Sequence, residues 1–222
     1  KADNVAAGLA NLGVVKGARV ALFCPLCLEF EVGFFGILRA GAVATTVSSA
    51  YKARELAHQI QDSSARVLIV HQALMDVVSE AMPAMEGVDH VVVIGESGIG
   101  VSFADLASTN SAPPSVDIDA IEDLAALPYS SGTTGLPKGV MLTHFNLTSN
   151  IAQLERMDPP ILGEDDVPLV HLPLFHVFGL NVLMNWAVAE GATQVLMSRF
   201  DMVHMLDLIE EHKVTLLITV PP

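Results

Sequence analysis

Residues 127–144, LPYSSGTTGLPKGVMLTH, gather chemical groups that can hold a chain of phosphates. From Ser130 to Lys138 the segment offers four hydroxyl groups, two glycines that let the backbone approach a ligand closely, and one ammonium group. The alternative is a surface loop rich in Ser and Gly that binds nothing. The density of hydroxyl groups beside Lys138, which follows the rigid residue Pro137, favours phosphate binding.

The segment does not fit the P-loop of nucleoside triphosphatases. A Walker loop, G-x-x-x-x-G-K-[ST], has Gly before its Lys and Ser or Thr after it, and it opens a helix. Here Pro137 precedes Lys138 and Gly139 follows it. Residues 123–129 and 139–144 can each form a strand, with a helix to follow, so the loop is predicted to join strand to strand. This disfavours a P-loop kinase.

The chain alternates between short β-branched runs and amphipathic segments, which predicts an α/β fold. The runs expected to form strands are apolar on both faces and occupy residues 18–23, 43–47, 66–70 and 90–95. Such strands form a parallel sheet between layers of helices. A polar stretch with two prolines, 108–120, interrupts the alternation, so we predict one α/β subdomain over residues 1–110 and another over 111–222.

Two helices can be predicted in the second half of the chain. One follows Thr143, which can cap it, and covers residues 145–156. The other follows Asp201, which can cap it in the same way. The apolar side chains that fall on one face of this second helix, and are therefore expected in the core, are Met202, Met205, Leu206 and Ile209.

The composition is that of a globular chain with an acidic surface. Of its 222 residues 51% are apolar, which is enough for a substantial core. The formal charge of −14 argues against nucleic acid or an anionic membrane as partner, because those surfaces require clustered Lys and Arg. An anionic ligand must then be held by local groups.

Residues 169–189 approach the length of a membrane span but contain Pro173, Gly179 and several polar side chains. We predict a buried strand and a buried helix there, and no transmembrane segment. The two cysteines, Cys24 and Cys27, have the spacing of a redox pair or of half a zinc site, but the simpler interpretation is a strand end followed by a proline turn. So few cysteines favour a reducing compartment, and we expect a cytoplasmic protein.

Residues 129–144 resemble the phosphate-binding loop of the adenylate-forming acyl-CoA synthetase superfamily, and most closely that of its 4-coumarate–CoA ligase branch. LPLFHVFGLN at 172–181 is similar to the second core motif of that branch, VTLLITVPP at 214–222 to a later strand, and FFGILRAGAVATTV at 34–47 to the N-terminal subdomain. The resemblance covers essentially the whole chain. It implies the three-layer, parallel-sheet subdomains of that enzyme's N-terminal domain.

Members of this family activate a carboxylic acid with ATP to an acyl-adenylate and pyrophosphate, and a thiol, usually coenzyme A, then displaces AMP. The resemblance implies that the β- and γ-phosphates of ATP are wrapped by Ser130, Ser131, Gly132, Thr133, Thr134 and Lys138, in a loop shaped by Gly135. It also implies that Ser130 helps to hold Mg²⁺. His176 would lie against the carboxylate and the α-phosphate, where an imidazole N–H can orient the nucleophile.

The resemblance also places the other substrates. Arg199 stands where this branch carries a basic residue near the CoA nucleotide, although a solvated surface Arg is an equal alternative. The wall of the acyl pocket would consist of Val177, Phe178 and Val182, which offer no hydroxyl to a phenol. A buried phenolic hydroxyl without a partner costs about 1–3 kcal/mol, so we predict a fatty or unsubstituted aryl acid.

The same pocket window holds no Asp or Glu to pair with an ammonium group, which disfavours an amino-acid adenylation domain. The chain matches less than half of such a ligase, so both predicted subdomains are expected to be incomplete at the chain ends. We expect a fragment that is inactive alone and whose uncovered surface supports homo-oligomers. The alternative is a remnant that binds a nucleotide or an acyl group without catalysis.

Overall fold

The structure, a computed structural model, describes residues 1–96, 98–130 and 137–220. It divides the chain into two compact units. The first comprises Lys1–Pro25 and Glu29–His144, and the second comprises Leu26–Leu28 and Phe145–Pro222. The domain boundary predicted at 110/111 stays a prediction. The two compact units divide the chain between His144 and Phe145.

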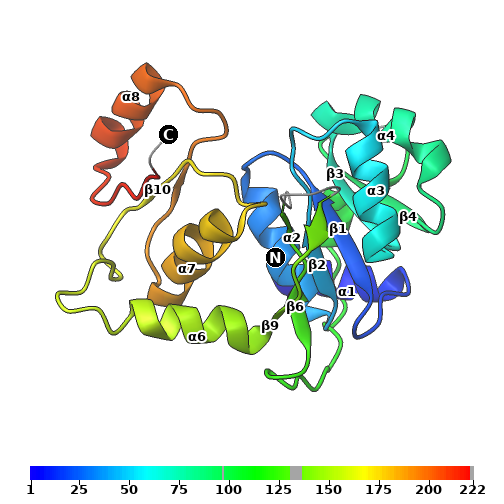
Figure 1. The fold of residues 1–222 in the computed structure, drawn as a ribbon, viewed down its shortest axis with the longest axis horizontal. Coiled ribbons are helices and arrows are strands. Elements are labelled where there is room, and N and C mark those ends of the chain that lie inside the picture. The colour runs from blue at the N-terminus through cyan, green and yellow to red at the C-terminus, as the bar shows by residue number, and fades with distance from the viewer. Residues whose placement is uncertain (97, 131–136, 221–222) are drawn as a thin grey trace. The chain divides into compact units, whose positions relative to one another are not determined.

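The first unit is built on a seven-stranded sheet with the strand order β5-β4-β3-β1-β2-β6-β9 (Figure 1). Its strands are β1 (Arg19–Phe23), β2 (Val43–Thr46), β3 (Val67–His71), β4 (His90–Ile94), β5 (Val101–Ser102), β6 (Leu124–Ala126) and β9 (Leu142–Thr143). All neighbours pair in parallel except β6 and β9. The predicted parallel sheet is therefore confirmed, and the strand after the polar stretch joins the same sheet.

Helices cover both faces of this sheet. One face carries α3 (Ala53–Ser63) and α4 (Met75–Ala81). The short 3₁₀ helix η1 (Gln72–Leu74) precedes α4, and a second one, η2 (Met82–Ala84), follows it. The other face carries α1 (Ala2–Asn11), α2 (Leu28–Arg39) and α5 (Phe103–Ala107). The sequence prediction of three layers is confirmed.

Successive side chains of β1 show which helices pack on each face of the sheet. Phe23 belongs to the buried cluster that includes Leu56 of α3 and Val78 of α4. Its neighbour Leu22 faces the other layer, where a Cβ added to Gly33 of α2 would lie 3.3 Å from the Leu22 Cδ1. Adjacent residues of a strand point to opposite faces, so both faces of β1 are buried under helices.

The second unit contains a small parallel pair, β10 (Leu169–Val170) with β11 (Val195–Leu196). Its helices are α6 (His144–Leu154), the π-helix η3 (Gly179–Asn185), α7 (Trp186–Glu190) and α8 (Met202–His212). The strand and helix predicted within 169–189 are confirmed. Among the described residues, no helix combines the length and the apolar character that crossing a bilayer requires.

The helix predicted after Phe200 forms, and its buried face agrees in part with the predicted one. Asp201 caps α8 by accepting a hydrogen bond from the His204 N–H at 2.8 Å, as predicted. Met205 and Leu208 are buried against Leu169, Val195 and Met197, with Ile209 partly buried. Met202 and Leu206 are instead exposed, because they lie outside the stripe of residues 205, 208 and 209 that packs in this cluster.

Candidate active site

The two ends of the hydroxyl-rich segment pair as a two-stranded antiparallel hairpin in the first unit, which we call the phosphate hairpin. Its strands are β7 (Tyr129–Ser130) and β8 (Lys138–Gly139), with Tyr129 opposite Gly139 and Ser130 opposite Lys138. The segment therefore connects strand to strand, as predicted. Residues that lie opposite each other in an antiparallel pair project from the same face, so Ser130 and Lys138 share one face.

The two faces of the phosphate hairpin have different surroundings. Ser130 and Lys138 are exposed. On the other face the ring of Tyr129 lies over Gly139, where an added Cβ would be 3.2 Å from two ring carbons. Lys138 forms no ion pair with any residue that the structure describes. A free ammonium group and a hydroxyl group on one exposed face can bind an anion.

Ser131, Gly132, Thr133, Thr134 and Gly135 lie outside the described residues, so their roles stay predictions. Ser130 and Lys138, which flank them, are the two predicted contacts that the structure brings together.

Helix α3 contacts the phosphate hairpin through two polar side chains that sequence reasoning missed. The Tyr129 hydroxyl donates a hydrogen bond to Asp62 Oδ2 at 2.6 Å. His58 Nε2 lies 3.0 Å from the carbonyl oxygen of Pro137, and its ring meets the Tyr129 ring edge to face at 6.4 Å. Burial, and then the hydrogen bond to Asp62, raise the pKa of Tyr129, so its hydroxyl remains a donor. The signal available in the sequence was a polar pair spaced i, i+4 on an amphipathic helix.

His176 lies in the second unit at the start of the helical segment that leads into η3. Its Nδ1 accepts a hydrogen bond from the Phe178 N–H at 3.3 Å, and its carbonyl accepts one from the Leu180 N–H at 2.9 Å. His176 therefore caps this helix start. Because Nδ1 is the acceptor, the neutral ring carries its proton on Nε2. The side chain is exposed, so this N–H is available to a ligand.

Gly179 fixes the turn that carries His176. A Cβ at this position would lie 2.3 Å from the Pro173 carbonyl oxygen and 3.2 Å from that of Leu172. No side chain fits there without moving the backbone that precedes His176. The π-helix η3 begins at this glycine, and π-helices are rare elements that often occur at functional sites.

The three predicted acyl-pocket residues have different surroundings. Val177 is exposed and Phe178 is half-buried. Val182 packs against a buried cluster that includes Leu162 and Trp186. Their role in binding an acid stays a prediction.

Four other side chains of interest can be assigned to positions in the fold. Arg199 is exposed in the bend after β11, so its contact with CoA also stays a prediction. His144 is the first residue of α6, and burial lowers its pKa. Cys24 and Cys27 lie between the end of β1 and the start of α2 and form no disulfide, which agrees with a strand end and a proline turn.

The described residues contain no cluster of three or more His, Cys, Asp or Glu side chains that could hold a metal ion. Mg²⁺ usually keeps several waters and binds to substrate phosphates with only one or two protein ligands. The exposed Ser130 hydroxyl fits the role of one such ligand. It does not form a metal site by itself.

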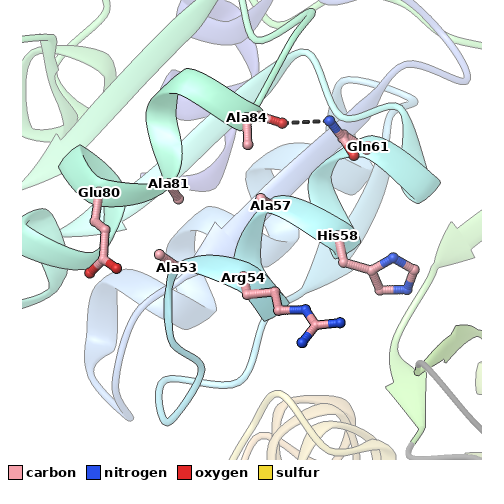
Figure 2. A pocket seen from close by; sticks show the side chains of 8 residues that line it. All are labelled: Ala53, Arg54, Ala57, His58, Gln61, Glu80, Ala81 and Ala84. Carbon is pink, nitrogen blue, oxygen red and sulfur yellow. Dashed lines mark hydrogen bonds between the residues drawn. The ribbon is translucent and has the colours of Figure 1, made fainter.

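An open groove of about 440 Å³ runs along α3, beside α4 and η2 (Figure 2). Its lining consists of Ala53, Arg54, Ala57, His58, Gln61, Glu80, Ala81 and Ala84. Glu80 lies at one end and His58 at the other (Figure 2). His58 is therefore shared between the groove and the phosphate hairpin.

Comparisons with known proteins agree with the resemblance read from the motifs. The family model described as AMP-binding enzyme matches residues 1–222. The chain is 45% identical over 221 residues to 4-coumarate–CoA ligase 5 of Oryza sativa subsp. japonica, a match that covers 98% of this chain and 40% of that protein. The chain thus spans less than half the length of this relative.

Solved structures give the same result. A long-chain-fatty-acid-CoA ligase (FadD1) from Archaeoglobus fulgidus superposes with a TM-score of 0.89 at 32% identity, covering 100% of this chain and 43% of the other. The ATP-bound MatB of Rhodopseudomonas palustris superposes with a TM-score of 0.81 at 32% identity, covering 97% of this chain and 42% of the other.

Proposed function

Because this chain belongs to the AMP-binding enzyme family, we propose that its full-length protein is an acid–thiol ligase that activates a carboxylic acid with ATP. The carboxylate attacks the α-phosphorus, pyrophosphate leaves, and an acyl-adenylate forms. A thiol, which we propose to be that of coenzyme A, then attacks the acyl carbon and AMP leaves. The observation that supports this most directly is the pair of Ser130 and Lys138 on one exposed face of the phosphate hairpin.

The chemistry asked of this chain is mainly electrostatic. Two anions must meet, and negative charge builds up on the departing pyrophosphate. The protein has a formal charge of −14, so its overall field repels ATP. Lys138, which has no ion-pair partner among the described residues, supplies positive charge where the phosphates would bind.

His176 is proposed to act on the acid and the α-phosphate. Its Nδ1 is occupied by the Phe178 N–H, so the Nε2–H is the group that can donate to an anionic oxygen. Such a donor orients the carboxylate and stabilises the adenylate without itself transferring a proton. Mg²⁺ would supply further charge neutralisation on the phosphates, with Ser130 as one ligand.

The substrate is proposed to be a fatty or unsubstituted aryl acid, because Val177, Phe178 and Val182 have no hydroxyl to offer a phenol. That FadD1 is a long-chain-fatty-acid ligase supports this choice, whereas the 4-coumarate ligase favours a phenolic acid. A contact of Arg199 with CoA, a cytoplasmic location and the inactivity of residues 1–222 alone also stay predictions.

The function can be tested by acid-dependent release of pyrophosphate from ATP by the full-length protein. We expect release with medium-chain fatty acids and with cinnamate, and slower release with 4-coumarate. Faster release with 4-coumarate would overturn the proposed substrate class while leaving the reaction intact.

The role of Lys138 can be tested in the same assay. Lys138→Ala removes the proposed phosphate contact, so we expect the KM for ATP to rise by at least roughly 10-fold, which corresponds to a charged hydrogen bond. Lys138→Arg is the matched control because it retains the charge. An unchanged KM for ATP and an unchanged turnover in Lys138→Ala would contradict the proposed function.

A further inference from the structure

We propose that helix α3 fixes the phosphate hairpin in its binding conformation through His58, Gln59 and Asp62, which act as positioning residues for ATP. The inference rests on the function proposed above. None of these three side chains belongs to the segment that resembles a known motif. His58 contacts Pro137 and Asp62 contacts Tyr129, near the two ends of the hydroxyl-rich segment. Gln59 is linked to Leu127 through Thr45.

The first contact is a buried chain of hydrogen bonds below the hairpin. Gln59 Nε2 donates to Thr45 Oγ1 at 2.8 Å, and the Thr45 hydroxyl donates to the Leu127 carbonyl oxygen at 2.9 Å. Gln59 Nε2 also donates to the Thr46 carbonyl at 3.1 Å. Gln59 is 1% exposed and Thr45 is fully buried, so these bonds are shielded from water. These hydrogen bonds connect α3 through β2 to Leu127, two residues before the hairpin begins.

The second contact holds the first hairpin strand. Tyr129, in β7, donates its hydroxyl proton to Asp62 at 2.6 Å. A hydrogen bond to an ionised carboxylate is short and stronger than one between neutral groups. The raised pKa of the Tyr129 hydroxyl means that the donor keeps its proton at neutral pH.

The third contact holds the second strand. The Pro137 carbonyl oxygen can only accept a hydrogen bond, so His58 Nε2, 3.0 Å away, must carry the proton. Pro137 immediately precedes Lys138. Both neutral and protonated imidazole can supply this donor, so the contact does not depend on the charge of His58.

The three side chains act together because of their spacing. Positions 58, 59 and 62 lie on neighbouring parts of one helix surface, since positions 58 and 62 are one turn apart. Asp62 reaches residue 129 in the first hairpin strand and His58 reaches residue 137 next to the second. Gln59 reaches residue 127 through Thr45. Holding Tyr129 toward α3 fixes the alternation of the hairpin, and Ser130 and Lys138 must then face the opposite, exposed side.

The test compares pairs of variants of the full-length protein by their KM for ATP, their KM for the acid and their thermal unfolding. We expect Tyr129→Phe, Asp62→Ala and His58→Leu each to raise the KM for ATP by roughly 3- to 10-fold, the range for one lost hydrogen bond. The KM for the acid should change less than about 2-fold, within the effect of one weak interaction. His58→Gln, which retains a donor, should restore the value.

The double variant Tyr129→Phe with Asp62→Ala should resemble either single variant, because both changes remove the same bond. The matched control is Gln61→Ala on the same helix. Its amide donates to the Ala84 carbonyl beside the groove and does not contact the phosphate hairpin. This control should leave the KM for ATP unchanged.

Two outcomes separate this inference from the function on which it rests. If Lys138→Ala raises the KM for ATP but the α3 variants do not, the inference alone is wrong. The same holds if the α3 variants raise both KM values equally and lower the unfolding temperature, which would indicate a merely structural role. If Lys138→Ala also leaves the KM for ATP unchanged, the proposed function and the inference fail together.

Discussion

His176 combines a structural and a chemical property in one imidazole ring. Its Nδ1 caps the helix start by accepting from the Phe178 N–H, and this bond leaves the proton on Nε2. A histidine inside an apolar run is more often a satisfied core residue. Here the side chain is exposed, although the Pro173 carbonyl accepts from the His176 backbone N–H and holds the turn at 3.2 Å.

The two properties of His176 can be separated by substitution. Asn is among the best helix-capping residues but has no ring N–H, whereas Ala has neither property. We expect His176→Asn to keep the free energy of unfolding within about 0.5 kcal/mol, and His176→Ala to lose roughly 1 kcal/mol. Both should slow adenylate formation by roughly 100-fold, the low end for the loss of one oriented donor.

Urea titration and acid-dependent pyrophosphate release measure these effects in the full-length protein. Full activity in His176→Asn would show that the cap, and not the imidazole N–H, is what the site needs from this position.

At the scale of elements, glycine allows two close approaches. Gly139 lies under the Tyr129 ring and lets the two hairpin strands pack against α3, and Gly179 lets the π-helix η3 begin against the Pro173 carbonyl. The second approach is much tighter, since 2.3 Å is far inside van der Waals contact and the obstructing atom is backbone. The start of η3 and the turn that carries His176 therefore require a residue without a Cβ at position 179.

Gly179→Ala should consequently displace the segment before His176. We expect a loss of roughly 1–3 kcal/mol in the free energy of unfolding, as for other overpacked sites. Adenylate formation should fall as well, because the imidazole moves. The matched control is Gly163→Ala in the same unit, where an added Cβ comes no closer than 3.9 Å to another residue. Equal stability of the two variants in urea would rule out this account of Gly179.

At the scale of the whole molecule, one buried carboxyl group makes stability depend on pH. Glu31, on α2, is only 9% exposed, and desolvation raises its pKa from 4.5 to about 7. The folded state then binds more protons than the unfolded state between these two values. With respect to Glu31, the free energy of unfolding is therefore greatest below about pH 4.5 and decreases as the pH rises to about 7.

Glu31→Gln should remove this dependence, because the amide stays neutral. We expect the variant to gain roughly 1–3 kcal/mol at pH 8, with the upper part of that range discounted for partial solvation, and little at pH 4.5. Glu29→Gln, on the same helix but half-buried, is the control. Urea titrations at both pH values measure the difference. A gain that is the same at both pH values would contradict the assignment to Glu31 ionisation.

The sequence predicted those parts of the fold that depend on local pattern. Strands apolar on both faces predicted β1 to β4 and their helical layers, and the strand-to-strand placement of the phosphate segment followed from its flanks. His176 could be singled out only through the resemblance to a family. The prediction that Met202 and Leu206 lie in the core was wrong. The sequence of a helix does not show how wide a surface packs against it.

The contacts of α3 could not be predicted for a different reason. His58 meets Pro137 and Asp62 meets Tyr129 across sequence separations of 79 and 67 residues. Such contacts depend on where α3 lies relative to the sheet. The π-helix was missed because a period of 3.6 residues is the only helical pattern that a sequence displays clearly.

The hydrogen-bond chain from Gln59 through Thr45 to Leu127 bears on protein engineering. A designer who transplants the phosphate hairpin into another scaffold as one continuous loop would leave its anchors behind. The transferable module is discontinuous: it includes a helix and an inner strand that come some 80 residues earlier in the chain, as the separation of 82 residues between Thr45 and Leu127 shows. Exchanging the loop between homologues should preserve ATP binding only when Gln59 and Thr45, or equivalent hydrogen-bonding residues, are exchanged together with it.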